Sequence, residues 1–422
     1  MDYHRILPLA GVASLIALSA CGTTTTSGTN NTASCTGVVH VATDLPVSGS
    51  DASDGKPTEN GARLAVTQAN SKKLLGGCTV ELVAKDDASV ALGKHDPNLG
   101  AQNIAALAGD ASIVGVVGPF NSSVAKAELA IANNAGLTLV SPANTNPGLT
   151  IVGSTPDVDT ATLRPHMDAV NYFRVCTTDI GQGKGLADTA TNKLNAKKVF
   201  VIDDAETYGQ GLAKEFAKDF KANGGSVIDA VSLPGATKDF KDTLNKAKSA
   251  GADLIFFGGT SSNGGGIIRK QMADVGLTAA FLGGDGIVDA EFFTESGAAG
   301  NGAYGTVAAP EPGKLDSAKQ FVTDFKAAYQ SDATPYAANA FDAMNIILAA
   351  VKKTIDDNGG KLPGDAKAFR ESVRVNMTKT DYNGVIGHTT FDKNGDTTNV
   401  LLTLFKGADQ KWAFDSSITL KA

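Results

Sequence analysis

The chain has 422 residues, with 37 Lys and Arg, 44 Asp and Glu and a formal net charge of −7. This length is sufficient for two domains with separate cores. The basic residues are scattered along the chain, which argues against a nucleic acid as the partner.

The N-terminus predicts an exported protein. An apolar run over 6–20 is short for a membrane span but suits a signal peptide, and no later stretch is long and apolar enough to cross a membrane. The run ends in Leu18-Ser19-Ala20-Cys21, which resembles the bacterial lipobox. We therefore expect a signal peptide over 1–20 and a lipid on the Cys21 thiol, which anchors the chain on the periplasmic or cell-surface side of a bacterial membrane. An ordinary signal peptide with an incidental cysteine is the alternative, and the polar residues 21–35 suit a flexible tether.

Short apolar runs alternate with amphipathic helical patterns along most of the mature chain. This alternation predicts an α/β protein with two doubly wound parallel-sheet lobes. The strand candidates are 38–45, 80–85, 113–117, 137–140, 171–175, 199–203, 227–233, 254–257, 281–283 and 305–309. The helical patterns include 60–70, 124–134, 212–222, 240–249, 265–275, 317–329 and 336–357, and a hairpin of 385–391 with 400–405 is expected after them.

Three cysteines remain after Cys21. Cys35 precedes the first strand candidate and Cys78 precedes the second. If these two strands are neighbours in a parallel sheet, both thiols lie at the same edge, and in an oxidising compartment a Cys35–Cys78 disulfide is expected. Three cysteines allow three pairings, and in this one Cys176 stays as a buried thiol.

Two short loops, 118–123 and 141–145, follow neighbouring strand candidates, and the first leads directly into a helical pattern. Both loops contain small hydroxyl residues. Free N–H groups and the helix dipole at such a position favour an anion, and a hydroxyl adds a donor. In open α/β sheets ligands lie outside the carboxyl ends of the strands. The two loops together therefore predict a site for one small carboxylate.

These loops belong to a set of motifs that resembles the branched-chain amino-acid-binding proteins of ABC transporters, from about residue 38 to 414. The motifs are Asp86-Asp87-Ala88, 118–123, 141–145, Tyr208-Gly209-Gln210-Gly211, Phe257-Gly258-Gly259, Gly283-Gly284-Asp285-Gly286 and Phe391-Asp392-Lys393-Asn394-Gly395. The resemblance implies a type 1 periplasmic binding fold whose chain crosses between two lobes three times. It places lobe one at 36–178 plus 308–383 and lobe two at 179–307 plus 384–422.

The resemblance also implies a ligand site. Ser122 falls where the family binds an α-carboxylate, Thr145 falls on a second-loop threonine, and Ala143 falls where a backbone carbonyl accepts from the α-ammonium. The alternative is structural: Ser122 caps its helix and Thr145 shapes a turn.

On lobe two, Asp285 falls where the family has an acidic residue for the ammonium. Tyr208, Tyr336 and Phe120 fall at aromatic positions near the ligand, although aromatic residues in such places are often core filler.

The sequence departs from the family at three points. The family usually has Glu at the position of Asp285, and the leucine-binding members have a tyrosine where this chain has Thr260. The loop 49–55 lacks an aromatic residue that several members place over the ligand's side chain. We expect a more polar and roomier pocket, whose amino acid the family alone does not name.

The expected function is a solute-binding lipoprotein that captures an amino acid in the cleft and presents it to ABC permease subunits. A ligand-sensing or cell-wall-regulating lipoprotein on the same fold is the alternative. The histidines show no ligand spacing and no catalytic set is recognisable, so we expect neither an enzyme nor a cofactor nor a metal.

Overall fold

The computed structural model describes residues 35–420. The expected signal peptide, Cys21 and nearly all of the expected tether lie outside this range. Among the described helices, none combines the length and the apolar character that a membrane span requires.

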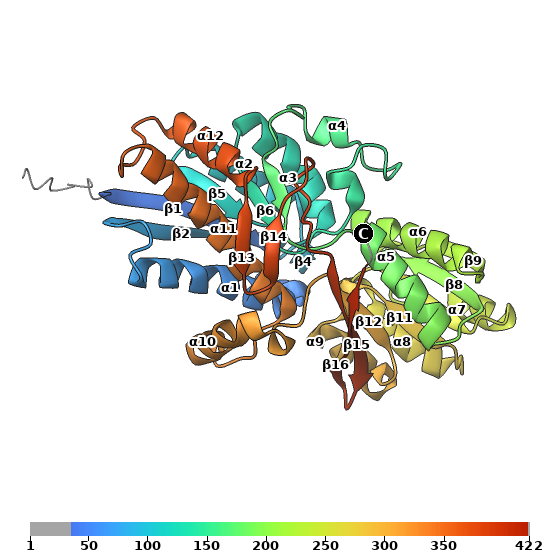
Figure 1. Ribbon diagram of the computed structural model, residues 1–422. Coiled ribbons are helices and arrows are strands. Elements are labelled where there is room, and N and C mark those ends of the chain that lie inside the picture. Colours follow the sequence, from blue (N-terminus) through green and yellow to red (C-terminus); the bar gives the residue numbers. More distant parts are fainter. Residues whose placement is uncertain (1–34, 421–422) are drawn as a thin grey trace, which may run out of the picture. The chain divides into compact units, whose positions relative to one another are not determined.

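The first sheet has five parallel strands in the order β2-β1-β5-β6-β7 (Figure 1). These strands are β1 (Gly37–Leu45), β2 (Cys78–Asp86), β5 (Ile113–Val117), β6 (Leu139–Ser141) and β7 (Tyr172–Arg174). Each lies within two residues of its predicted position at either end. Short buried apolar runs are therefore sufficient to locate the parallel strands of this sheet.

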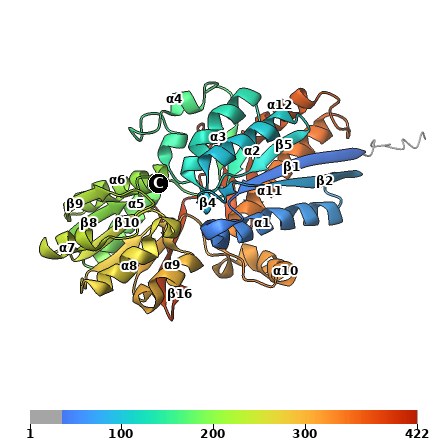
Figure 2. The same ribbon diagram turned by 180° about the vertical axis from the view of Figure 1, so that it is seen from behind.

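Helices cover both faces of the first sheet, as the views in Figures 1 and 2 show. Val39 and Val41 of β1 face one core, and Ala42 faces the other, because successive side chains of a strand point to opposite faces. The first core is closed by α1 (Ala52–Ser71), α10 (Lys319–Tyr329), α11 (Pro335–Asp357) and α12 (Ala366–Met377). The second core is closed by α2 (Pro97–Gly109), α3 (Ser122–Ala135) and α4 (Thr160–Leu163).

The second sheet has seven strands in the order β16-β15-β12-β11-β10-β8-β9. Its strands are β8 (Lys198–Asp203), β9 (Ser226–Ser232), β10 (Leu254–Gly258), β11 (Ala280–Gly283), β12 (Tyr304–Val307), β15 (Leu401–Ala408) and β16 (Lys411–Thr419). β8 to β12 pair in parallel, and β15 and β16 add an antiparallel edge. The prediction of two doubly wound sheets is confirmed, with this antiparallel edge as an addition.

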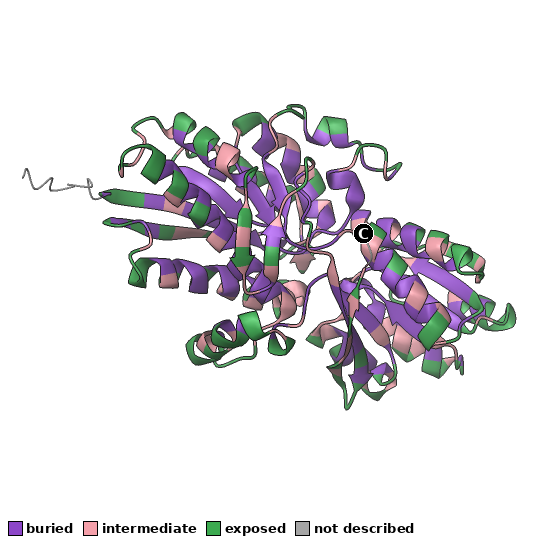
Figure 3. Cartoon of the chain, viewed as in Figure 1, coloured by how far each residue is buried: buried purple, intermediate pink, exposed green. Residues whose placement is uncertain are grey.

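The central strands of the second sheet, β8, β10, β11 and β12, are also buried on both faces (Figure 3). Ile255 and Phe257 of β10 face one core, while Leu254 and Phe256 face the other. The helices over the first of these cores are α7 (Lys241–Ser249), α8 (Gly265–Asp274) and α9 (Ala290–Ser296). Those over the other are α5 (Asp179–Asp188) and α6 (Thr207–Ala222).

Local signals explain where several helices begin. The Asp96 side chain accepts a hydrogen bond from the N–H of Asn98 at 2.9 Å, and Pro97 begins α2. Thr334 accepts from the N–H of Ala337 at 3.2 Å, and Pro335 begins α11. Both starts combine an N-cap with proline at the first helical position.

The expected loop 49–55 is only partly a loop. A 3₁₀ turn, η1 (Gly49–Asp51), leads directly into α1, which begins at Ala52. The Ser50 N–H donates to the carbonyl of Gly93 at 2.9 Å, in the turn of a small hairpin that the sequence did not predict. That hairpin pairs β3 (Ala88–Ser89) with β4 (Lys94–His95).

The C-terminal pairing differs from the prediction. The structure pairs β13 (Asp381–Gly384) with β14 (Gly387–Thr390), and β15 with β16, rather than 385–391 with 400–405. The β15–β16 turn has Asp409 and Gln410 at φ of 50° and 57°. Two-residue hairpin turns need positive φ and therefore usually contain glycine. This turn contains no glycine, so the usual sequence signal for such a hairpin is absent.

The chain passes between the two sheets three times, after β7, after β12 and after β14. Ile386 and Phe391 pack in the first sheet's core. The third passage therefore lies later than the expected boundary at residue 384, because these apolar side chains are buried on the first sheet. The other boundaries stay predictions.

The predicted disulfide between Cys35 and Cys78 is confirmed, and Cys176 is a buried free thiol. The bridge joins the amino ends of β1 and β2, where Gly37 is paired with Cys78. It closes a loop with a sequence separation of 43. In the chain-entropy model a loop of this size stabilises the fold by about 4 kcal/mol.

Three fully buried carboxylates, Asp44, Asp87 and Glu128, lie together under the first sheet's loops. Asn103 donates to one Asp44 oxygen at 3.0 Å, and the other five oxygens have no donor among the described residues. Burial raises the pKa of Asp44 to about 7, and burial together with the neighbouring acidic groups raises the pKa of Asp87 and Glu128 well above the ordinary range. At a pH between the ordinary carboxyl pKa and these raised values, the folded protein therefore retains protons on these groups that the unfolded chain releases.

Replacing Glu128 with glutamine tests this cluster. A carboxyl whose pKa is raised by folding stabilises less as pH rises above its unfolded pKa, because the unfolded state ionises first. We expect Glu128→Gln to increase the free energy of unfolding by about 1–3 kcal/mol at pH 7 and by much less near pH 4. Urea denaturation at both pH values measures this difference. Glu81→Gln, on the exposed side of β2, is the control, and an equal effect of both variants at both pH values would contradict the prediction.

Candidate functional site

Two buried loops at the carboxyl edge of the first sheet form the core of the site. The first runs from Gly118 at the end of β5 to the start of α3, and the second follows β6 through Asn146. Gly118 has φ of 142°, and a Cβ there would lie 2.3 Å from the carbonyl oxygen of Asp44. Glycine is therefore required where the first loop passes over β1.

Direct hydrogen bonds hold the two loops together. The Ser141 hydroxyl donates to the carbonyl of Pro119 at 2.7 Å, and the Asn144 amide donates to the carbonyl of Phe120 at 2.6 Å. The backbone N–H of Asn146 donates to the Ser122 hydroxyl at 3.4 Å. The sequence predicted two neighbouring loops, and the structure joins them into one surface.

Arg174, fully buried at the end of β7, fixes the second loop. Its guanidinium donates to the carbonyls of Asn144 at 3.1 Å and Asn146 at 2.8 Å, and to the Thr150 hydroxyl. Its Nε is 2.6 Å from Asp396, a residue 222 positions later in the chain. A guanidinium offers five donors in a rigid fork, so one side chain can orient several carbonyls. Sequence reasoning missed Arg174, because a single arginine at a strand end carries no local signal.

Three of the expected site residues, Ser122, Ala143 and Thr145, lie in these loops, and all three are buried. The Thr145 hydroxyl has no hydrogen-bond partner among the described residues, and no side chain caps α3. The Ser122 hydroxyl faces the second loop instead of capping its own helix. Free N–H groups in the first turn of α3, together with these hydroxyls, suit a carboxylate.

Asp285, which follows β11 of the second sheet, is brought together with two of the predicted aromatic residues. One carboxylate oxygen accepts from the Tyr208 hydroxyl at 2.8 Å and the Gln182 amide at 2.7 Å, and the other accepts from the Tyr336 hydroxyl at 2.6 Å. The Phe120 ring packs edge-on against Tyr336 with centroids 5.3 Å apart. The four predicted residues Asp285, Tyr208, Tyr336 and Phe120 therefore form one connected group.

Asp285 is 9% exposed, and burial raises its pKa while the three neutral donors oppose that rise. A carboxylate has about four acceptor positions, and three donors occupy three of them. Room for one further donor therefore remains on Asp285.

A cavity of about 190 Å³ lies beside Asp285 and Tyr336. Its walls combine apolar side chains with three carboxylates and contain no lysine or arginine. The lining residues are Asp54, Asp285, Val288, Val307, Glu311, Ala333, Thr334, Pro335, Tyr336, Phe405 and Trp412.

Asp54 belongs to the first turn of α1, within the segment 49–55 that lacks the aromatic residue of several family members. Burial raises the pKa of Asp54, and the nearby carboxylates of Asp289, Asp51 and Asp285 raise it further.

Asp179, at the start of α5, is a second acidic residue at the site that sequence reasoning missed. Its N–H donates to the carbonyl of Thr145 at 2.8 Å, so it lies directly against the second loop. It is fully buried, its carboxylate oxygens have no donor among the described residues, and burial raises its pKa well above the ordinary range. Asp at the start of a helix usually indicates an N-cap, so the sequence pattern around Asp179 does not indicate a role in ligand binding.

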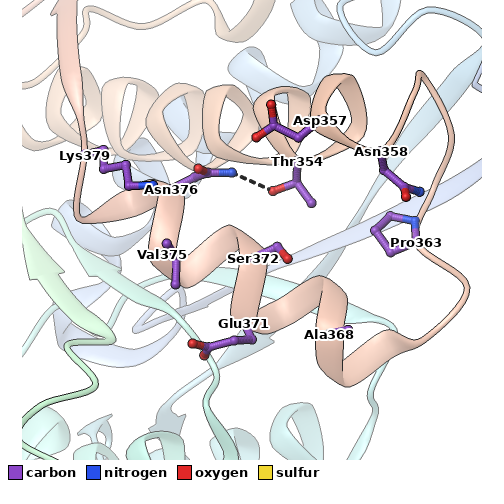
Figure 4. Close-up of a pocket in the computed structure, with 10 residues that line it drawn as sticks. All are labelled: Thr354, Asp357, Asn358, Pro363, Ala368, Glu371, Ser372, Val375, Asn376 and Lys379. Atoms are coloured by element: carbon purple, nitrogen blue, oxygen red, sulfur yellow. Dashed lines mark hydrogen bonds between the residues drawn. The ribbon is translucent and has the colours of Figure 1, made fainter.

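A larger pocket of about 460 Å³ lies between α11 and α12, away from the two loops (Figure 4). All of its lining residues belong to these helices and the segments at their ends, and the Asn376 amide donates to Thr354 across it at 2.9 Å. It touches neither Asp285 nor the hydroxyl loops, so its size does not make it the ligand site. Within residues 35–420, no group of three or more His, Cys, Asp or Glu side chains is arranged to hold a metal ion.

Comparison with known proteins agrees with this geometry. Residues 38–410 match the family model described as periplasmic binding protein. The chain belongs to the periplasmic binding protein family. This confirms the resemblance inferred from the motifs and the type 1 fold inferred from it. A family of binding proteins agrees with the expectation that the chain is not an enzyme.

Individual relatives align with most of the length of this chain. The chain is 29% identical to Leu/Ile/Val-binding protein homolog 3 of Brucella melitensis, over 87% of this chain and 90% of that protein. The leucine-binding protein LivK of Thermotoga maritima is 26% identical with a TM-score of 0.75, over 90% of this chain and 98% of that one. LivJ of Streptococcus pneumoniae, solved in complex with isoleucine, has the same identity and TM-score, over 91% of this chain and 100% of that one.

Removing Arg174 tests its support of the second loop. Arg174→Met leaves Asp396 buried without its ion-pair partner, so we expect the free energy of unfolding to fall by about 3–5 kcal/mol in urea denaturation. Lys193→Met, which breaks the partly exposed Lys193–Asp415 pair (2.7 Å), is the control and should change it by no more than about 1 kcal/mol. Similar small effects of both variants would show that Arg174 does not hold the loop.

Proposed function

We propose that the chain is the solute-binding component of an ABC importer and captures a free amino acid between its two sheets. The observation that carries this proposal is the placement of opposite chemistries on opposite sides. The first sheet presents hydroxyls and free N–H groups, and the second sheet presents the carboxylate of Asp285. An amino acid is a zwitterion and needs both kinds of partner once water is removed.

In this proposal the ligand's carboxylate binds the first turn of α3, with the Ser122 hydroxyl and Thr145 as further donors. The ligand's ammonium group binds the remaining acceptor position of Asp285 and the carbonyl of Ala143. The carboxyl oxygens of Asp179 lie beside Thr145 and can accept a further hydrogen bond from the ammonium group. Tyr208 and Tyr336 hold Asp285 in place, and Phe120 packs against Tyr336.

The cavity beside Asp285 receives the ligand's side chain. Val288, Val307, Phe405 and Trp412 supply apolar walls, which suit the alkyl chains that the named relatives bind. The carboxylates of Asp54 and Glu311 distinguish this cavity from a purely apolar one. An acidic side chain would find no cationic partner among the residues that line this cavity, so we propose a neutral or cationic amino acid as the ligand.

Capture requires that the ligand contacts both sides better when they are close together. The hydroxyl loops and Asp285 belong to elements of different sheets, and the chain passes between the sheets three times. A hinge motion about these passages would bring the two sets of partners onto one ligand, which stabilises the closed form by its differential contacts. Permease subunits would recognise that closed form.

A thermal-shift screen of the unlipidated protein against the common amino acids tests the proposal. A ligand at one hundred times its Kd adds about 2.7 kcal/mol to the free energy of unfolding. We expect neutral or cationic amino acids to raise the Tm and aspartate and glutamate to have the smallest effect. If no amino acid raises the Tm, the proposal fails.

Asp285→Asn then tests the ammonium contact by calorimetry. Loss of a charge-assisted bond should weaken binding of the amino acid by about 2–4 kcal/mol, while Ser122→Ala should weaken it by about 1 kcal/mol because backbone donors remain. The matched ligand is the corresponding 2-hydroxy acid, which has no ammonium group, and its affinity should change little in Asp285→Asn. If the amino acid also binds both variants within twofold of wild type, the ligand lies elsewhere.

We also propose that the mature chain is anchored to a bacterial membrane by a lipid on Cys21. The Leu18-Ser19-Ala20-Cys21 ending after a short apolar run supports this proposal. Cys21→Ser should remove the lipid and release the protein from the membrane fraction, as measured by fractionation and intact mass. Cys176→Ser is the control and should leave the anchor in place. Unchanged membrane retention and mass of Cys21→Ser would overturn the proposal.

A further inference from the structure

A hydrogen-bonded cluster outside the proposed ligand site connects the two sheets. It begins on the β3–β4 hairpin, which follows β2 of the first sheet. The hairpin rests on η1, where the Ser50 hydroxyl and N–H both donate to the carbonyl of Gly93, at 3.1 and 2.9 Å. A Cβ on Gly49 would lie 2.4 Å from that same carbonyl oxygen, so glycine is needed for the close approach. This packing holds Lys94 and His95 at a defined position.

Glu206, at the start of α6 on the second sheet, receives donors from the hairpin. Its carboxylate accepts from Lys94 at 2.6 Å, from His95 at 2.9 Å and from the Ser123 hydroxyl at 3.2 Å. Asn263, on its own side, donates to it at 3.0 Å and accepts a further bond from Lys94. Three of the four donors to Glu206 therefore come from the first sheet.

His95 is held between two carboxylates and is 1% exposed. Its Nδ1 is 2.6 Å from Asp51 and its Nε2 is 2.9 Å from Glu206. Carboxylates only accept, so both bonds require a protonated imidazole. Burial disfavours the charge, but the hydrogen bonds to Asp51 and Glu206 outweigh burial and raise the pKa of His95 to about 10. His95 is therefore a cation at neutral pH, and its bond to Glu206 is an ion pair between the sheets.

The cluster borders both halves of the proposed ligand site without belonging to it. Ser123 is the neighbour of Ser122 in the chain, and Glu206 is two residues before Tyr208, which donates to Asp285. A second bond between the sheets lies close by, where the Asn146 amide donates to the carbonyl of Thr207 at 2.6 Å. Any opening between the sheets at this point would separate Lys94 and His95 from Glu206.

We propose that Lys94, His95 and Glu206 form a clasp that stabilises the closed form and thereby slows release of the ligand. These are positioning residues, because they act on the ligand by holding the two sides together. In the open form their charges are hydrated, which offsets much of the attraction and leaves closure reversible. The ligand-free protein should therefore be closed in part, and apparent affinity should depend on that closed fraction. The inference rests on the proposed function only for its effect on ligand release.

Glu206→Gln tests the clasp, because it keeps the shape and removes the charge. Spin labels at Lys72→Cys, at the end of α1, and Lys221→Cys, in α6, report the distance between the two sheets that these helices cover, by double electron–electron resonance. Both lysines are exposed. The Cys21→Ser background avoids a further exposed thiol, since Cys176 is buried and Cys35 and Cys78 are bridged. Without ligand, we expect Glu206→Gln to lose the short-distance population that the otherwise wild-type protein shows.

Stopped-flow measurements with L-leucine as the probe provide the second arm. Dissociation should be about 10- to 100-fold faster in Glu206→Gln, with little change in the association rate. Asp415→Asn, which removes an ion pair within the second sheet's own elements, is the control and should behave as wild type. Lys94→Met should shift both measurements in the same direction to a smaller extent, and it serves if Glu206→Gln folds poorly.

Identical distance distributions for wild type and Glu206→Gln would overturn the clasp, and so would an unchanged dissociation rate. A lower Tm alone, without either change, would show an ordinary structural role and also overturn it. If L-leucine does not bind, the distance measurement still decides the clasp, while the amino-acid screen decides the proposed function.

Discussion

The arrangement of the site depends on one buried cation. Arg174 binds two carbonyls of the second loop, the Thr150 hydroxyl and Asp396, and a fully buried guanidinium is tolerated only when its donors are used in this way. Because the loop is held through the carbonyls of Asn144 and Asn146, its remaining groups, such as the Thr145 hydroxyl, stay available. The bond to Asp396 also ties this loop to the segment that leads into the third passage between the sheets.

The surroundings of each carboxylate at the site and in the neighbouring cluster determine what it can do. Glu206 and Asp51 have cationic partners and serve as structural anions. Asp285 is surrounded by neutral donors, which hold it in place without cancelling its charge. Asp179 has no donor among the described residues, and burial raises its pKa. The same functional group therefore supplies the proposed clasp and the proposed partner for an ammonium group, and burial together with the hydrogen-bond partners makes the difference.

Family membership explains the two sheets and the site between them, but the walls of the cavity belong to this chain. Asp54 and Glu311 bring carboxyl groups to the place where the expectation was only a more polar and roomier pocket. A methylene more or less changes discrimination by about 1–3 kcal/mol, whereas burying an anionic side chain without a cationic partner costs more. The carboxyl groups of this cavity therefore bear more directly on the proposed ligand class than an identity of 26–29% to proteins named for branched-chain amino acids.

The sequence by itself determined the parallel strands of both sheets, the two hydroxyl loops and the Cys35–Cys78 bridge, and its motifs named Asp285, Tyr208, Tyr336 and Phe120. Each depends on a short-range pattern, on a family motif or on the pairing of two consecutive long strands, β1 and β2. Only the tertiary structure decided the partners of Arg174, the exposure of Asp54 to the cavity and the bonds of His95. Asp396 is 222 residues from Arg174 and Glu206 is 111 residues from His95. Hydrogen bonds depend on distance in space, and no periodicity or local propensity indicates which side chains meet when two sheets come together.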